Sequence, residues 1–146
     1  MTTTRPVEQQ TAAAPPRLGP LQYLGYSAGD AANNLAFIYA ERGINLDVAL
    51  QLATSAKQRM PNDPSVDDTI GWIYYKKDLP SLAVRPLESA LKQLPNNAEL
   101  LVHLGLTYAK LGEKEKARQT LERALKLDPR VVGGQEAKRV LASVSP

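Results

Sequence analysis

The sequence of 146 residues contains no cysteine and a single histidine, His103. Disulfides, thiol catalysis and thiolate metal sites are therefore excluded, and one histidine offers little material for a metal cluster or a catalytic pair. Asp67 and Asp68 are adjacent, so they diverge on a helix, and we interpret them as support for its N-terminus rather than as an acid–base pair. Gly133-Gly134 lacks the lysine and the flanking pattern of a phosphate-binding loop. We predict no enzyme, no cofactor and no metal site.

Long hydrophobic runs are absent as well. No apolar stretch approaches the roughly 20 residues that a membrane-spanning helix needs. The opening MTTTRPVEQQTAAAPPRLG has no apolar core of the kind that a secretory signal needs. We expect a cytoplasmic protein without direct membrane insertion, and association with the cell envelope is the alternative.

Basic residues are not concentrated in one patch. Residues 1–97 carry nine basic and nine acidic side chains, so the net charge of +3 arises in residues 98–146. In that segment Lys and Arg alternate with Glu, which is typical of a solvated helix face rather than of a nucleic-acid footprint. We predict no nucleic-acid partner.

What the sequence does contain is an internal period of 34 residues. Pro61, Pro95 and Pro129 are separated by this spacing. Two sets of alanines keep it too: Ala49, Ala83 and Ala117, and Ala56, Ala90 and Ala124. Because several positions share one period, one small unit occurs three times, and we predict a stack of repeats rather than a single irregular core.

Each unit has the hydrophobic periodicity of two helices. In the third unit, apolar residues such as Leu101 and Leu104 fill a first helix, and Gly112 interrupts it. Leu121 and Leu125 then mark a second helix with spacings of three and four residues. The chain is therefore predicted to be all-α.

The second unit follows the same pattern and has two local features. Its first helix has two candidate N-terminal caps: Asp63 with Pro64 at the first helical position, or Ser65 with Asp68 three residues later. The sequence does not choose between them. Pro86 falls inside the second helix, where it removes a backbone hydrogen bond, so we expect a bend there.

The first unit is one residue longer than the others. Gly43 to Asp78 spans 35 residues, whereas Ala49 to Ala83 spans 34. An insertion in a helix would rotate its apolar face by about 100°, whereas a turn absorbs an extra residue at little cost. We therefore place the insertion in the turn between Gly43 and Ala49.

Units starting at Gly29, Pro64 and Ala98 resemble the tetratricopeptide repeat. In that family a small residue stands where the two helices of a unit cross, with a large apolar residue before it and an aromatic residue three positions after it. The matching sets are Leu35, Ala36 and Tyr39; Ile70, Gly71 and Tyr74; and Leu104, Gly105 and Tyr108. Alanine or glycine lets the helix axes approach at this point.

The resemblance implies an α–α superhelix, or solenoid, of three helix pairs at residues 29–63, 64–97 and 98–131. Residues 1–28 are rich in Thr, Ala and Pro, and we interpret them as a flexible tail. Its apolar end, LQYLGY at 21–26, either docks onto the first repeat or stays disordered. Residues 132–146 are predicted to form a capping helix. Val140, Leu141 and Val144 would cover the last repeat, and Glu136, Lys138 and Arg139 would face water.

In this family the first helix of each pair lines a concave face, through positions on one helical side. Carried over with their neighbours, these positions give a predicted partner-binding groove. It comprises Asn33, Phe37, Asp68, Thr69, Trp72, Tyr75, Val102, His103 and Leu106. The only Phe and the only Trp of the chain belong to it, which favours an aromatic and apolar anchor for a partner. The alternative is that these rings pack against a neighbouring helix or the tail.

Some members of the family hold a partner's terminal carboxylate with a clamp of Lys, Asn and Arg. The corresponding positions here are Asn33, Phe37, Thr69, Glu99 and His103, so the clamp is missing nearly everywhere. The resemblance therefore implies a protein–protein interaction module that takes up a polypeptide segment by apolar contacts. The alternative is a self-associating scaffold piece of a larger complex. Through NNLAFIYAERG and DDTIGWIYYKK, the chain also resembles the closing repeats of long bacterial repeat proteins linked to envelope or exopolysaccharide systems. For the scaffold alternative, this resemblance implies a cell-envelope complex as one setting.

Overall fold

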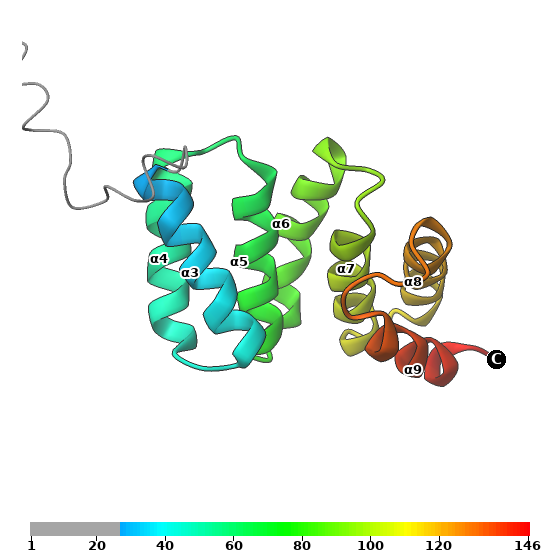
Figure 1. Cartoon of the computed structure of the whole chain (residues 1–146). Coiled ribbons are helices and arrows are strands. Elements are labelled where there is room, and N and C mark those ends of the chain that lie inside the picture. The colour runs from blue at the N-terminus through cyan, green and yellow to red at the C-terminus, as the bar shows by residue number, and fades with distance from the viewer. Residues whose placement is uncertain (1–26) are drawn as a thin grey trace, which may run out of the picture.

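A computed structural model describes residues 27–146, which form seven α-helices and no β-strand (Figure 1). The helices are α3 (Ala28–Arg42), α4 (Leu46–Arg59), α5 (Pro64–Lys76), α6 (Pro80–Gln93), α7 (Ala98–Lys110), α8 (Lys114–Leu127) and α9 (Gly134–Val144). The prediction of an all-α chain is confirmed. The predicted tail and the docking of LQYLGY lie outside the described residues, apart from the tail's last two positions, which belong to the start of α3.

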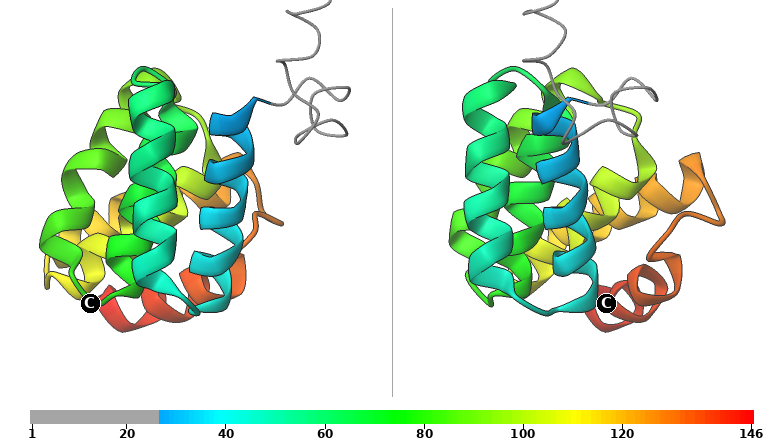
Figure 2. Two further views of the ribbon diagram at one scale, coloured as in Figure 1. Left: turned by 90° about the vertical axis from the view of Figure 1, so that its left-hand side faces the viewer. Right: turned by 60° about the vertical axis from the view of Figure 1, so that its left-hand side comes forward.

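The helices form three antiparallel pairs, α3–α4, α5–α6 and α7–α8, followed by α9 against α7 and α8. The first helices of the pairs, α3, α5 and α7, are neighbours in one layer. In Figure 1, α4 is seen from the side, whereas α8 is seen nearly end-on, so the last pair is rotated relative to the first. Figure 2 shows this rotation from two other directions. Successive pairs are thus rotated into a superhelix, as predicted.

The ends of the helices follow from local side-chain chemistry. Ser27 and Asp30 form a capping box, in which each side chain bonds the other residue's backbone N–H, so α3 begins earlier than the predicted Gly29. At α5 the side chain of Asp63 accepts a hydrogen bond of 2.9 Å from the backbone N–H of Ser65. The first of the two candidate caps is therefore the one used.

The turns inside the three pairs have a residue with a positive φ angle at the equivalent position: Gly43, Asp78 and Gly112. In the second and third pairs a single residue separates this position from the next helix. In the first pair Ile44 and Asn45 both stand there, and Asn45 also has a positive φ of 50°. The extra residue of the first unit thus lies in the turn, and asparagine tolerates the left-handed conformation that it requires.

Pro86 lies in the middle of α6, and the helix continues unbroken from Pro80 to Gln93. Its missing N–H leaves the carbonyl of Leu82 without the usual helical partner. Leu82 is exposed, so water can take that place. The bend itself stays a prediction.

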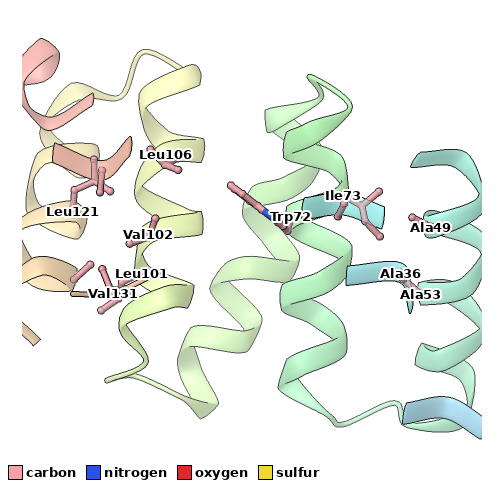
Figure 3. Packing of buried hydrophobic residues seen from close by; sticks show 13 residues of the cluster. Ala36, Ala49, Ala53, Trp72, Ile73, Leu101, Val102, Leu106, Leu121 and Val131 are labelled. Carbon is pink, nitrogen blue, oxygen red and sulfur yellow. The ribbon is translucent and has the colours of Figure 1, made fainter. Parts of the chain in front are cut away.

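The two helices of each pair cross at a tightly packed position. A Cβ added to Gly71 would lie 2.4 Å from Cγ of Leu87, and one added to Gly105 would lie 2.5 Å from Cδ2 of Leu121. In the first pair the equivalent positions are Ala36 and Ala53, both fully buried (Figure 3). Where the second helix carries leucine, the first carries glycine, and where the second carries alanine, the first carries alanine. The crossing therefore stays close in all three pairs.

Asp67 and Asp68 point to different neighbours, as their adjacency predicts. Asp67 is buried. It forms an ion pair with the ammonium of Lys57 at 2.8 Å and accepts a hydrogen bond of 3.3 Å from the hydroxyl of Ser89. It therefore links α5 to both α4 and α6. Asp68 instead contacts His103 on α7.

Helix α9 closes the C-terminal end of the stack. Ala137 is fully buried, and Leu141 and Val144 are half-buried against the apolar clusters of the stack. Lys138 and Arg139 are exposed. A capping helix with a polar outer side is thus confirmed, although Glu136, which was expected in water, is only partly exposed.

We expect Gly71→Ala to lower the free energy of unfolding by about 1–3 kcal/mol, because overpacking at the crossing outweighs alanine's better helix propensity. Urea denaturation measures the change. Gly29→Ala is the matched control, since its Cβ would meet only the flexible end of Met60, at 3.1 Å.

The second part of this prediction concerns coupling between the two helices. Leu87→Ala should cost less in the Gly71→Ala background than in the wild type, because the new methyl group fills part of the cavity. Strict additivity of the two changes would show that the contact does not set the helix separation.

Candidate functional site

The first helices of the three pairs bring the chain's only tryptophan to the middle of the concave side. Figure 3 shows Trp72 extending from α5 toward α7, the helix that carries Val102 and Leu106. The ring of Trp72 stacks on Tyr75, with centroids 4.6 Å apart, and on His103, with centroids 4.0 Å apart. Trp72 is only 6% exposed.

Polar contacts fix this stack in place. The indole Nε1 of Trp72 donates a hydrogen bond of 2.5 Å to Oε1 of Glu41 on α3. His103 Nδ1 lies 2.7 Å from Oδ1 of Asp68. An ionised carboxylate can only accept, so the bond requires a proton on Nδ1. The three first helices are thereby joined through side chains on the concave side.

One hollow of about 400 Å³ lies beside this stack, and we call it the α9 hollow. Its lining residues are Glu41, Trp72, Tyr75, Lys76, Val102, His103, Leu106, Val132, Gly133 and Glu136. The segment before α9 and the first turn of α9 form one of its walls. The cap therefore has a second role, since it also shapes the concave surface.

A second hollow of about 440 Å³ lies toward the N-terminal end, and we call it the α3 hollow. It is lined by Asn33, Asn34, Phe37, Ile38, Ser65, Asp68, Thr69 and Glu99. The hydrogen bond between Asp68 and His103 joins a residue of this hollow to a residue of the α9 hollow. The two hollows are therefore adjacent along the concave side.

All nine residues of the predicted groove line one of these two hollows. Asn33, Phe37, Asp68 and Thr69 line the α3 hollow, and Trp72, Tyr75, Val102, His103 and Leu106 line the α9 hollow. Six of them are buried, however: Asn33, Thr69, Trp72, Val102, His103 and Leu106. These six side chains pack beneath the exposed residues of the concave surface. That they contact a partner stays a prediction.

Sequence reasoning missed Glu41, Val132 and Glu136 as parts of this surface. Val132 and Glu136 come from the cap, whose position on the concave side has no signature in the repeat spacing. Glu41 lies one turn beyond the last groove position considered in α3. Its acceptor role could have been suspected only from a nearby buried indole N–H that needs a partner.

The carboxyl groups of the concave side lie close enough to affect one another. Burial raises the pKa of Glu99 above its usual range, the charges of Asp68 and Glu41 raise it further, and His103 lowers it. Burial also raises the pKa of the Tyr75 phenol, and the nearby Glu136 contributes to the rise.

The described part of the chain has no helix long and apolar enough to cross a bilayer. Within residues 27–146, no group of three His, Cys, Asp or Glu side chains is arranged to hold a metal ion.

Residues 98–131 match the family model for the tetratricopeptide repeat. A TPR repeat-containing protein of Pseudomonas aeruginosa is 35% identical over 75 residues, which is 51% of this chain and 12% of that protein. Human N-alpha-acetyltransferase 25, NatB auxiliary subunit, is 28% identical over 99 residues, or 68% of this chain and 10% of that protein. The chain thus spans about a tenth of the length of these curated relatives.

Solved structures share the fold. The first TPR domain of Spaghetti, bound to an HSP90 peptide, superposes with a TM-score of 0.70 at 19% identity, covering 80% of this chain and 90% of that one. The Sgt2 TPR domain of Aspergillus fumigatus gives a TM-score of 0.69 at 20% identity, covering 82% and 78%.

Stacked antiparallel helix pairs, with their first helices lining a concave side, define an α-helical repeat solenoid. The family match identifies residues 98–131 as a tetratricopeptide repeat, and the whole solenoid shares the fold of solved tetratricopeptide-repeat domains. Domains of this family are protein–protein interaction modules, and the comparisons indicate no catalytic family.

We expect Glu99→Gln to be more stable than the wild type at neutral pH. The raised pKa means that the folded state disfavours the ionised carboxyl. This cost is present above the folded pKa and vanishes below the pKa of an unfolded glutamate, about 4.3. Urea unfolding should therefore show a difference at pH 7 and none near about pH 3. Equal stability at pH 7 would contradict the crowding of carboxylates around Glu99.

Proposed function

We propose that this module binds a polypeptide segment of a partner protein on its concave side, by apolar contacts in the α9 hollow. The observation that carries the proposal is the α9 hollow itself, whose lining includes the half-exposed Tyr75 and the exposed Val132 together with the buried Leu106. The recess is lined by apolar and charged groups together, and its apolar part suits a large apolar side chain of a partner.

The rigid support of the surface favours binding as well. Stacking and hydrogen bonds hold Trp72 and Tyr75 in place before any partner arrives. Less conformational freedom is then lost on association, so more of the contact energy appears as affinity.

Recognition by a carboxylate clamp is not supported by the charges. The related domain of Spaghetti is bound to an HSP90 peptide, and it shares the fold at 19% identity. Here the α3 hollow has no basic side chain in its lining, and the α9 hollow has only Lys76. A terminal carboxylate would therefore meet more carboxylates than cations in either hollow.

The same charges disfavour a nucleic-acid partner, because Asp68 and Glu99 would repel phosphates. The proposal places the module in the cytoplasm, with its partner a protein or a peptide.

We expect Val132→Asp to weaken partner binding by at least about tenfold, or 1.4 kcal/mol, because it puts a charge into the apolar wall of the α9 hollow. Val132 is 63% exposed, so the fold should tolerate the change. The matched control is Val48→Asp on α4, which is 47% exposed and lines neither hollow.

Capture from a native lysate with the three proteins as baits measures the effect. A partner retained by the wild type and Val48→Asp but lost by Val132→Asp supports the site. Titration of the purified partner should then change the emission of Trp72, the only indole. Equal capture by all three baits would contradict binding in the α9 hollow.

The second candidate function is a scaffold piece that associates with another copy or with further repeats, in a larger and possibly cell-envelope complex. Leu35 and Ile38 on α3 favour it, because they are 40% and 46% exposed where the equivalent Leu104 of α7 is buried. In a longer stack this face of α3 would lie against a preceding repeat.

If this face holds copies together, Leu35→Glu combined with Ile38→Lys should convert an oligomer into a monomer. Size-exclusion chromatography with light scattering over a hundredfold range of concentration measures the state. The pair Val48→Glu and Leu82→Lys, two exposed apolar residues of the second helices, serves as control. A wild type that stays monomeric throughout would remove support for self-association.

A further inference from the structure

The α3 hollow has an unusual balance of charge and hydrogen-bonding groups. The only charged residues in its lining are Asp68 and Glu99, and both are acidic. The raised pKa of Glu99 shows that burial and the neighbouring Asp68 and Glu41 disfavour its negative charge. A cation in the hollow would relieve this cost.

Asn33, a residue of the same lining, has a side-chain acceptor without a hydrogen-bond partner. Asn33 is only 7% exposed, and its side-chain Oδ1 is buried and accepts no hydrogen bond. Buried polar atoms without a partner are uncommon and costly.

The orientation of the Asn33 amide follows from its neighbours. The hydroxyl of Ser65 donates to Oδ1 of Asp63 at 2.8 Å, so its oxygen is left as an acceptor for Nδ2 of Asn33 at 3.5 Å. Turning the amide over would place two acceptors against each other. Oδ1 is therefore the atom without a partner, and it needs a donor that the described residues do not supply.

The lining also includes two apolar side chains beside the polar Asn34, Ser65 and Thr69. Phe37 and the exposed Ile38 stand on α3 beside these acceptors. An aromatic face and an aliphatic chain suit the stem of a long basic side chain, whose charged end then reaches the carboxylates.

We propose that the α3 hollow binds an arginine side chain of the partner polypeptide, with the guanidinium between Asp68, Glu99 and Asn33. The inference rests on the proposed function, because it assigns a second contact to the same bound segment. Arginine carries five N–H donors in a planar fork, so one group can serve two carboxylates and an amide oxygen together. Asp68 keeps its second oxygen for this contact while the first one holds His103.

Because the two hollows are adjacent, one bound segment can occupy both, and this predicts the spacing of two of its side chains. An extended segment that places a large apolar side chain in the α9 hollow would carry its arginine a few residues away, toward the N-terminal end of the stack. The partner motif is therefore an apolar residue followed or preceded closely by arginine.

The test uses N-acetyl-arginine amide as the probe and N-acetyl-citrulline amide as its neutral isostere. Titration of the full chain, followed by amide NMR shifts, should give at least about fivefold tighter binding of the arginine probe, with shifts centred on Asn33 and Thr69. Free guanidinium ion should bind more weakly than the arginine probe, because it has no stem to contact Phe37.

Two carboxylate variants locate the contact. Glu99→Gln should reduce the affinity for the arginine probe to that for the citrulline probe without loss of stability. Glu122→Gln on α8 lines neither hollow and should leave binding unchanged. Val132→Asp should also leave the arginine probe unaffected, although it weakens the partner.

Equal binding of arginine and citrulline, or an unchanged affinity in Glu99→Gln, would overturn the inference. Guanidinium binding as tightly as the arginine probe would overturn the assignment to a side chain. If the arginine probe binds as expected while Val132→Asp retains every partner, the cationic site stands and the proposed apolar contact fails. If the partner is lost in Val132→Asp while arginine and citrulline bind alike, the proposed apolar contact stands and the arginine site fails.

Discussion

The structure depends on how closely the two helices of each pair approach at their crossing. Gly71 beneath Leu87 and Gly105 beneath Leu121 leave no room for a methyl group, and Ala36 and Ala53 fill the same place in the first pair. Because side chains of complementary volume hold the spacing, successive pairs stack with α3, α5 and α7 in one layer. The concave side is a result of that layer.

The surface built on this layer is supported by contacts between repeats as well as by contacts within them. Trp72 contacts α3 through its hydrogen bond to Glu41 and α7 through the stacked ring of His103. His103 is in turn hydrogen-bonded to Asp68 on α5. Trp72 and His103 are thus each positioned by a side chain of a neighbouring pair. The cap completes the arrangement, since Val132 provides an outer wall that no repeat supplies.

Much of the fold can be predicted from the sequence, because repeat spacing reports local packing. The small residue at each crossing, the extra residue at Ile44 and Asn45 and the apolar side of α9 all follow from periodicity and turn chemistry. The burial of Trp72 and the pairing of Asp68 with His103 do not, because they depend on contacts about 30 residues apart in sequence that no period encodes. The use of Asp63 as the N-cap of α5 could not be predicted from the sequence either, because Asp63 and Ser65 are both residue types that favour this position.

The alanine pair of the first repeat has an energetic consequence. Ala36 and Ala53 bring two side-chain carbons to their crossing, where Gly71 and Leu87 bring four, and each buried methylene is worth about 0.8 kcal/mol. In a stack whose units interact only with their neighbours, fraying starts where the internal stability is lowest. Amide exchange should accordingly be fastest in α3 and α4, and a ligand in the α3 hollow would protect the end of the molecule that opens most readily.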